Sequence, residues 1–278
     1  MNHPRPRAVG EWLLLPAPQH HPAPRLFCFP HAGGDATAFV PMGRALAPAA
    51  EVWAVRMPAR GGRTAVPMPA TFRALVRTLA AALLPHLGAG PVAFYGQSFG
   101  ALLALETARA LRPEHRPTAL ILAAAEPPGA WPGAAPPEYD AERLLDVCGA
   151  GALVAEVPEL RERALAAIRA DLAVRSGYRY RPGPPLACGL YALSGAADPL
   201  VRAHTLAGWS AHTTGRFAHH TVPGGHLPAS VDDRGPVGLL TSILERTRES
   251  SWSPPQPAPN PPPGPRTPRP APTAPRSG

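Results

Sequence analysis

Short hydrophobic runs alternate along the chain with longer stretches in which hydrophobic and polar residues are mixed. Runs of four to eight hydrophobic residues between turn-forming residues predict strands that are buried on both faces of a sheet. Between 71 and 87, hydrophobic residues recur at intervals of three and four, which predicts an amphipathic helix. The expected strands are 12–15 at a sheet edge, 25–29, 51–56, 92–95, 118–123, 186–193 and 217–222, and the expected helices are 37–46, 71–87, 99–111 and 237–248.

The order of these elements predicts an α/β fold. Strand and helix patterns alternate several times, which favours a mostly parallel sheet with helices on both faces. The alternation stops between about 126 and 180, where proline-rich pieces surround helical runs such as 159–169. Helices inserted at the carboxyl end of a sheet are typical of a lid over a site. We therefore expect a helical lid insertion at about 127–182.

Composition divides the chain into three parts. Of its 278 residues, 41 are proline, and residues 251–278 consist mainly of Pro, Ala, Arg, Thr and Ser. Such a segment cannot bury enough hydrophobic surface to fold, so 251–278 is predicted to be a disordered tail. Residues 1–24 are expected to form a partly disordered leader, with no structure in the first ten residues. Residues 25–250 contain enough hydrophobic residues for one domain with one core.

Charge and hydropathy argue against several classes of function. The net charge is +8, but five of the 27 basic residues, all arginine, lie in the two ends, so 11–250 carries only +3. That part shows no basic stripe, which argues against nucleic-acid binding. The hydrophobic run 12–15 is too short for a signal peptide, and no run is long enough to span a bilayer. The three cysteines lack the spacing of zinc ligands. We expect a cytoplasmic protein without membrane contact.

The pentapeptide Gly96-Gln97-Ser98-Phe99-Gly100 follows a predicted strand and precedes a predicted helix. Gly-x-Ser-x-Gly in this setting is typical of the nucleophile elbow, a sharp turn that exposes a strained serine above a sheet. The glycines are needed because a Cβ at either position would crowd the strand or the helix. The alternative is a glycine-rich turn that carries an ordinary surface serine.

A nucleophilic serine needs a base within hydrogen-bond reach, and the base needs a carboxylate that fixes its tautomer. In α/β-hydrolases these residues follow one another in the order Ser, Asp or Glu, His. Downstream of Ser98, Asp198 and His226 each lie in a glycine-containing loop just after a predicted strand. Apart from a histidine in the loop after 25–29, the other histidines lie before the sheet, after helices, in the connection after Asp198 or inside a strand. The order predicts a Ser98–His226–Asp198 triad, and the alternative for Asp198 is a helix cap.

An acyl-transfer site also needs hydrogen-bond donors for the oxyanion. One expected donor is the backbone N–H of Phe99, the residue after the serine. The second is expected from the loop after the strand 25–29, at the N–H of Ala32. The neighbouring His31 is a possible second base, but its position favours a role in shaping this loop.

Further short motifs follow one another through most of the chain. In order, they are Phe29-Pro30-His31-Ala32-Gly33-Gly34, Met57-Pro58-Ala59-Arg60-Gly61-Gly62-Arg63, Gly96-Gln97-Ser98-Phe99-Gly100, Ala170-Asp171-Leu172 with Tyr178, Gly195 with Asp198, Trp209, and Gly224-Gly225-His226. Over about 25–250, this series resembles the type II thioesterases that accompany polyketide and non-ribosomal peptide synthetases. Three departures from the family pattern occur: Ala59 replaces a glycine, Gln97 replaces a histidine, and Leu227-Pro228 replaces an aromatic pair.

The resemblance implies an α/β-hydrolase that cleaves acyl groups from the phosphopantetheine arm of acyl or peptidyl carrier proteins and clears stalled or misprimed units. It implies the triad Ser98, Asp198 and His226, with no metal and no cofactor. The lid would form the acyl pocket and admit the flexible arm. Arg60 and Arg63 would meet an acidic carrier protein or form a structural salt bridge.

Two other functions are compatible with the same residues. A serine esterase or acyltransferase that acts on small soluble esters would use the same triad, because the lid determines the choice of substrate. A non-catalytic hydrolase-fold protein would bind an acyl chain or a partner through its lid or its proline-rich tail. The expected oligomeric state is a monomer.

Overall fold

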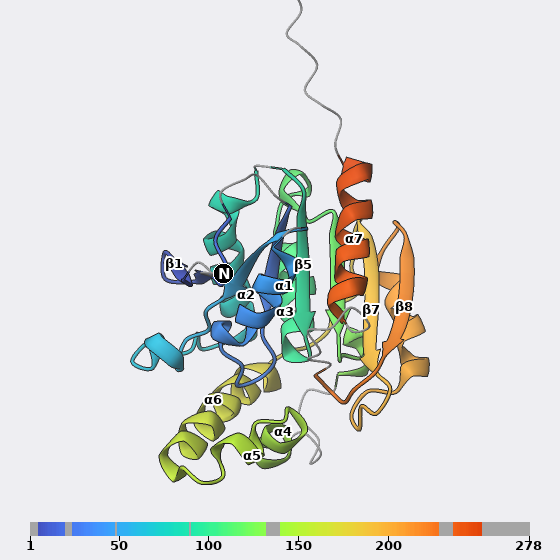
Figure 1. The fold of residues 1–278 in the computed structure, drawn as a ribbon. Coiled ribbons are helices and arrows are strands. Elements are labelled where there is room, and N and C mark those ends of the chain that lie inside the picture. Colours follow the sequence, from blue (N-terminus) through green and yellow to red (C-terminus); the bar gives the residue numbers. More distant parts are fainter. Residues whose placement is uncertain are drawn as a thin grey trace, which may run out of the picture.

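The computed structural model describes residues 5–19, 24–47, 49–88, 90–131, 140–227 and 236–251. Within these ranges, eight strands form one sheet in the order β1-β2-β4-β3-β5-β6-β7-β8 (Figure 1). Strands β3 to β8 pair in parallel, whereas β1 and β2 are antiparallel to their neighbours. The prediction of a mostly parallel sheet is therefore confirmed. Of the tail predicted to be disordered, only Ser251 is described, as the last residue of a helix, and 252–278 lie outside the described residues.

The strands are β1 (Arg7–Val9), β2 (Leu13–Leu15), β3 (Arg25–Phe29), β4 (Glu51–Val55), β5 (Val92–Gln97), β6 (Ala119–Ala123), β7 (Gly189–Gly195) and β8 (Phe217–Val222). The α-helices are α1 (Val40–Leu46), α2 (Phe72–Leu83), α3 (Phe99–Ala110), α4 (Ala141–Val147), α5 (Gly151–Val154), α6 (Pro158–Ser176) and α7 (Pro236–Ser251). Two 3₁₀ helices matter below: η1 (Ala36–Phe39) precedes α1, and η7 (Ala203–His212) lies between β7 and β8.

Two hydrophobic cores lie on opposite faces of the sheet. One core joins the sheet to α2 and α3, and the second joins it to η1, α1 and α7. The helices therefore cover both faces, as the alternation of strand and helix patterns predicts. None of the helices within the described ranges is long and apolar enough to cross a membrane.

The N-terminal residues do not match the expectation that the first ten lack structure. Strand β1 pairs with β2, and β2 pairs with β4, so β1 rather than 12–15 forms this edge of the sheet. Leu13 and Leu15 are both 1% exposed, which places the alternate side chains of β2 in the core. Burial of this pair explains why the leader is ordered here.

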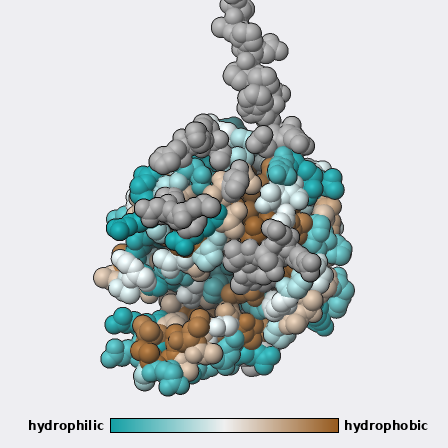
Figure 2. Space-filling view, in the orientation of Figure 1, coloured by the Kyte–Doolittle hydropathy of each residue, from teal (hydrophilic) through white to brown (hydrophobic). Residues whose placement is uncertain are grey.

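Helices α4, α5 and α6 form an insertion between β6 and β7, which agrees with the strand-free stretch in the sequence. They lie together beyond one end of the sheet (Figure 1). The insertion exposes three large hydrophobic side chains, Leu153, Val157 and Leu160, and Figure 2 shows a hydrophobic patch over this part of the molecule. Helix α6 extends to Ser176, seven residues beyond the predicted run 159–169.

Ala59 stands where the resembled family has glycine, and its φ of 60° lies in the left-handed region. This conformation costs an L-residue about 1–2 kcal/mol, whereas glycine adopts it without strain but is more flexible when unfolded. We expect Ala59→Gly to raise the free energy of unfolding by about 0.5–1 kcal/mol, as measured by urea denaturation. The control Ala80→Gly, inside α2, should lower it by about 1 kcal/mol. A destabilised A59G protein would contradict the assignment of strain to this turn.

Candidate active site

Ser98 lies between β5 and α3 with φ 52° and ψ −118°, a strained conformation for a residue other than glycine. A Cβ on Gly96 would overlap the backbone of Gly100 and Ala101. A Cβ on Gly100 would overlap the carbonyl oxygen of Phe29 at the end of β3. Both glycines are thus required by close backbone approach, as the elbow pattern predicts.

The structure brings the three predicted triad residues together. His226 Nε2 lies 3.0 Å from Ser98 Oγ, and His226 Nδ1 lies 3.0 Å from each carboxylate oxygen of Asp198. Since the carboxylate can only accept, Nδ1–H donates to Asp198 and Nε2 is left to accept the proton of the serine hydroxyl. His226 is 1% exposed and Ser98 is 6% exposed, so this chain of hydrogen bonds is largely shielded from water.

Strand register explains the convergence. Gln97 at the end of β5 is level with Ala123 in β6, and Ala123 is level with Leu193 near the end of β7. The carboxyl ends of these parallel strands meet at one edge, and each triad residue follows such an end. The loops after β7 and β8 are joined directly, because Ala197 N–H donates to the carbonyl oxygen of Gly224 at 2.9 Å. This bond holds the Asp198 loop beside the His226 loop.

Asp198 also accepts hydrogen bonds from the backbone of its own loop. Its Oδ1 accepts hydrogen bonds from the backbone N–H groups of Leu200 at 2.8 Å and Val201 at 3.1 Å. The helix-cap alternative is therefore only partly right: the carboxylate binds backbone donors, but η7 begins later, at Ala203. These bonds fix the carboxylate so that it faces the imidazole.

The two expected oxyanion donors lie on elements that pack together. Phe99 is the first residue of α3, and the first N–H groups of a helix have no partner within the helix. The Ala32 N–H donates to no acceptor within the described residues. The close approach of Gly100 to the end of β3 places the start of α3 against the loop that carries Ala32. Since neither N–H donates to another group in the described ranges, both are available for the oxyanion role expected from the sequence.

A buried ion pair connects the insertion to this loop. Asp171 in α6 forms two hydrogen bonds with Arg60, at 2.6 and 2.7 Å, and accepts a third from the Gly33 N–H at 2.8 Å. The side chains of Arg60 and Asp171 are 5% and 1% exposed. The sequence placed Asp171 only in the lid, so this partnership was missed. Asp171 and Arg60 do fall within the family motifs, which was the available signal.

Arg60 and Arg63 are structural and do not offer a surface for an acidic partner. Arg60 is engaged by Asp171, and Arg63 donates to the carbonyl oxygen of Arg56 while its guanidinium lies 4.2 Å from the ring centroid of Trp12. Of the two alternatives for these arginines, the internal one is right. The family departure Gln97 is also buried, and its amide donates to the hydroxyl of Tyr95 at 3.1 Å. Pro228, in another departure, lies outside the described residues.

His31 shapes the loop and makes no hydrogen bond to Ser98. Its carbonyl oxygen accepts from the Gly34 N–H at 2.9 Å, whereas its Nδ1 is buried without a partner among the described residues. Burial, reinforced by electrostatic interactions with His226 and Arg60, lowers the pKa of His31 to about 4. The ring therefore stays neutral at physiological pH.

This pKa has a consequence for stability. Between about pH 6.5 and pH 4, the unfolded chain binds a proton at His31 that the folded protein does not, so stability falls as the pH falls. We expect His31→Gln to remove this loss, which amounts to at most ~1.4 kcal/mol per pH unit. Urea denaturation of both proteins at pH 7, 6, 5 and 4 measures the difference. Parallel pH profiles for the two proteins would contradict a neutral buried His31.

A mostly parallel sheet with a strained serine at the turn from β5 to α3 places the chain among the α/β-hydrolases. Residues 24–247 match the family described as thioesterase domain. The chain is 33% identical over 224 residues to thioesterase PikA5 of Streptomyces venezuelae, covering 78% of this chain and 80% of that protein. The chain therefore belongs to the thioesterase family.

Solved structures place the chain more closely. It is similar to the type II thioesterase BorB from the borrelidin biosynthetic cluster, with a TM-score of 0.69, 35% identity and coverage of 86% of this chain and 96% of that one. It is also similar to the thioesterase RedJ from the prodiginine pathway of Streptomyces coelicolor, with a TM-score of 0.69, 31% identity and coverage of 84% and 92%. The resemblance to type II thioesterases found in the sequence is thereby confirmed.

Proposed function

We propose that the protein hydrolyses acyl thioesters on the phosphopantetheine arm of acyl or peptidyl carrier proteins and so clears stalled or misprimed units from polyketide or non-ribosomal peptide synthetases. The hydrogen-bonded Ser98–His226–Asp198 chain, in a member of the thioesterase family, is the observation that carries this proposal. The type II thioesterases among its structural relatives support the same reaction class.

The geometry supports a two-step acyl transfer. Ser98 Oγ attacks the thioester carbonyl carbon while His226 Nε2 takes the hydroxyl proton, and Asp198 steadies the imidazolium. The N–H groups of Ala32 and Phe99 donate to the oxyanion. The C–S bond breaks, and the leaving sulfur takes the proton from His226. A water molecule, deprotonated by His226, then attacks the acyl-serine, which releases the carboxylic acid and restores Ser98.

The insertion of α4 to α6 is suited to act as the lid of the acyl site. It lies beyond one end of the sheet (Figure 1). Asp171 of α6 accepts a hydrogen bond from the N–H of Gly33, the residue next to the proposed oxyanion donor Ala32. The insertion therefore contacts the catalytic loop directly. Through this contact, a movement of the lid would change the position of the Ala32 N–H in the oxyanion site.

The substrate class is tested by comparing two kinds of substrate on the full-length protein. One is a carrier protein loaded with acyl-phosphopantetheine, and the other is a small aryl ester of the same acyl group. The proposal predicts a much higher kcat/KM for the loaded carrier protein. A strong preference for the aryl ester would favour an esterase, and no turnover of either substrate would favour a binding protein.

A further inference from the structure

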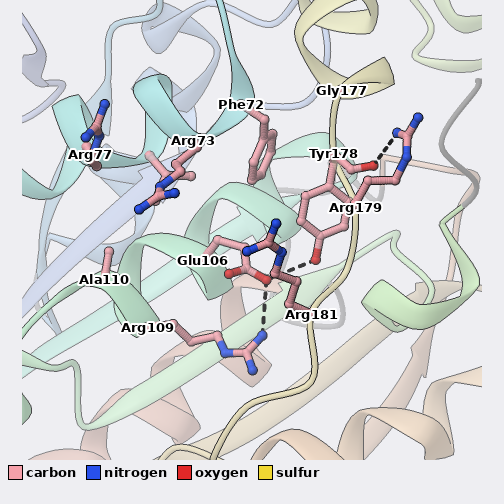
Figure 3. Close-up of a pocket in the computed structure, with 11 residues that line it drawn as sticks. Phe72, Arg73, Arg77, Glu106, Arg109, Ala110, Gly177, Tyr178, Arg179 and Arg181 are labelled. Carbon is pink, nitrogen blue, oxygen red and sulfur yellow. Dashed lines mark hydrogen bonds and ion pairs between the residues drawn. The ribbon is translucent and has the colours of Figure 1, made fainter.

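A pocket of about 570 Å³ is lined by five arginines and a single carboxylate. The arginines come from three elements: Arg73 and Arg77 from α2, Arg109 from α3, and Arg179 and Arg181 from the segment after α6 (Figure 3). Phe72, Val76 and Tyr178 supply the apolar part of the wall. None of these residues belongs to the proposed triad, and their cationic character is not needed for acyl transfer.

Most of this positive charge is not neutralised within the described chain. The one carboxylate, Glu106, pairs with Arg109 at 3.2 Å and accepts a hydrogen bond from the hydroxyl of Tyr178 at 2.9 Å (Figure 3). Within the part of the chain that the structure describes, Arg179 donates only to backbone carbonyl oxygens. Among the described residues, Arg73, Arg77 and Arg181 form no ion pair, and all three are exposed.

The excess of positive charge in this pocket is large for the domain. Five arginines against one glutamate exceed the net charge of +3 carried by residues 11–250. Such a cluster repels itself in the free protein and attracts an anionic partner. Guanidinium groups bind carboxylates and phosphates through paired hydrogen bonds, so the chemistry of the pocket fits a partner that carries several of these groups.

One residue of the pocket wall, Phe72, packs against the residue that follows the candidate nucleophile. The centroid of the Phe72 ring lies 4.7 Å from the ring centroid of Tyr178 and 6.1 Å from that of Phe99, the residue after Ser98. Glu106 is eight residues further along α3 than Ser98, which corresponds to about 12 Å along the helix axis. A partner seated on the pocket therefore needs a flexible arm that spans about this distance to reach Ser98.

We propose that this arginine pocket is the docking surface for an acidic helix of the carrier protein. The proposal rests on the function proposed above and names where its partner binds. Arg73 and Arg77 are four residues apart, so they lie on one face of α2, one turn from each other. That spacing matches carboxylates four residues apart on an opposing helix. The arginines are spread over three elements, which suits a protein surface better than a single small anion.

The experiment separates docking from chemistry by using two thioesters. One is an acyl-loaded carrier protein, and the other is the N-acetylcysteamine thioester of the same acyl group, which has no carrier. The double variant R73E/R77E should raise KM for the loaded carrier about tenfold or more and reduce the dependence of kcat/KM on salt, since it removes steering charges. Its kcat/KM for the N-acetylcysteamine thioester should equal that of the wild type.

The matched control is Arg44→Glu, a charge reversal at an exposed arginine in α1, which packs on the opposite face of the sheet. It should leave both substrates unaffected. The docking proposal is overturned if R73E/R77E has the same KM for the loaded carrier as R44E, or if it loses both substrates equally. It is also overturned if free coenzyme A binds the wild type but not R73E/R77E while the carrier kinetics stay unchanged, which would define a small-anion site.

Failure of the proposed function would give a different result. In that case, the wild type itself would show no higher kcat/KM for the loaded carrier than for the N-acetylcysteamine thioester. A wild type that prefers the loaded carrier, combined with unaltered R73E/R77E kinetics, would leave the function in place and remove only the docking site.

Discussion

Replacing Asp198 by Asn should lower kcat for acyl thioester hydrolysis by about 10⁴-fold while the fold is retained. The amide oxygen of Asn can still accept hydrogen bonds from Leu200 and Val201 N–H, as Asp198 Oδ1 does now. The amide NH₂ group then faces His226 Nδ1, which must accept. The ring proton moves to Nε2, so Nε2 can no longer take the proton of Ser98.

This prediction is measured as kcat with a loaded carrier protein, beside circular dichroism and the melting temperature. Asp146 in α4, an exposed acidic residue outside the triad, offers a control: Asp146→Asn should keep kcat within about twofold of the wild type. A D198N protein within tenfold of wild-type kcat would show that Asp198 does not orient His226.

The second large effect is expected from the ion pair between Asp171 and Arg60. Asp171→Ala should lower the free energy of unfolding by about 3–5 kcal/mol, because it leaves the buried guanidinium of Arg60 without its counter-charge. It also releases the Gly33 N–H from α6. Since Ala32 is next to Gly33, we expect kcat to fall by about 10²–10³-fold through loss of a fixed oxyanion donor.

Two further variants separate these consequences. Glu162→Ala removes an exposed ion pair with Arg169 on the same helix, at 3.8 Å, and should change the free energy of unfolding by less than about 1 kcal/mol. The double variant Arg60→Met with Asp171→Leu should recover much of the lost stability, because apolar pairs of similar size often replace buried ion pairs without loss. It should not recover kcat, because the Gly33 bond is still missing. An Asp171→Ala protein as stable as the wild type would contradict the account.

The triad was predictable because each of its residues can be recognised from the short stretch of sequence around it. Each of its residues stands a few positions after a strand, and parallel strands present their carboxyl ends at one edge of the sheet. Ser98, Asp198 and His226 could therefore be chosen from their chain order and from the glycines around them. The glycine pattern also predicted the strained turn at Ser98.

The Arg60–Asp171 pair was not predictable in the same way. Its partners are 111 residues apart, and their contact depends on how the insertion folds back over the loop after β3. No periodicity encodes such a packing angle. The sequence predicted only that Arg60 pairs with an acidic group, either in this chain or in a partner protein. The burial of both side chains shows that the acidic group is Asp171 of the same chain.

The ends of helices and strands were also predicted less well than their existence. Hydrophobic spacing predicted one helix over 71–87, but α2 ends at Leu83 and a 3₁₀ turn follows (Leu84–His86). Pro85 explains the change, because proline has no backbone N–H and therefore cannot donate the next hydrogen bond of the α-helix. Strand β2 was predicted as 12–15, but β1 was missed because its residues are mostly exposed and form no hydrophobic run.

The most direct test of the central claim is labelling of the full-length protein with a fluorophosphonate, followed by mass mapping of the modified residue. The account predicts a single label on Ser98, slowed by carrier protein loaded with an acyl group and absent from S98A. A label on another residue, no label at all, or labelling that the loaded carrier protein does not slow would contradict the assignment of Ser98 as the nucleophile that meets the carrier-bound acyl group.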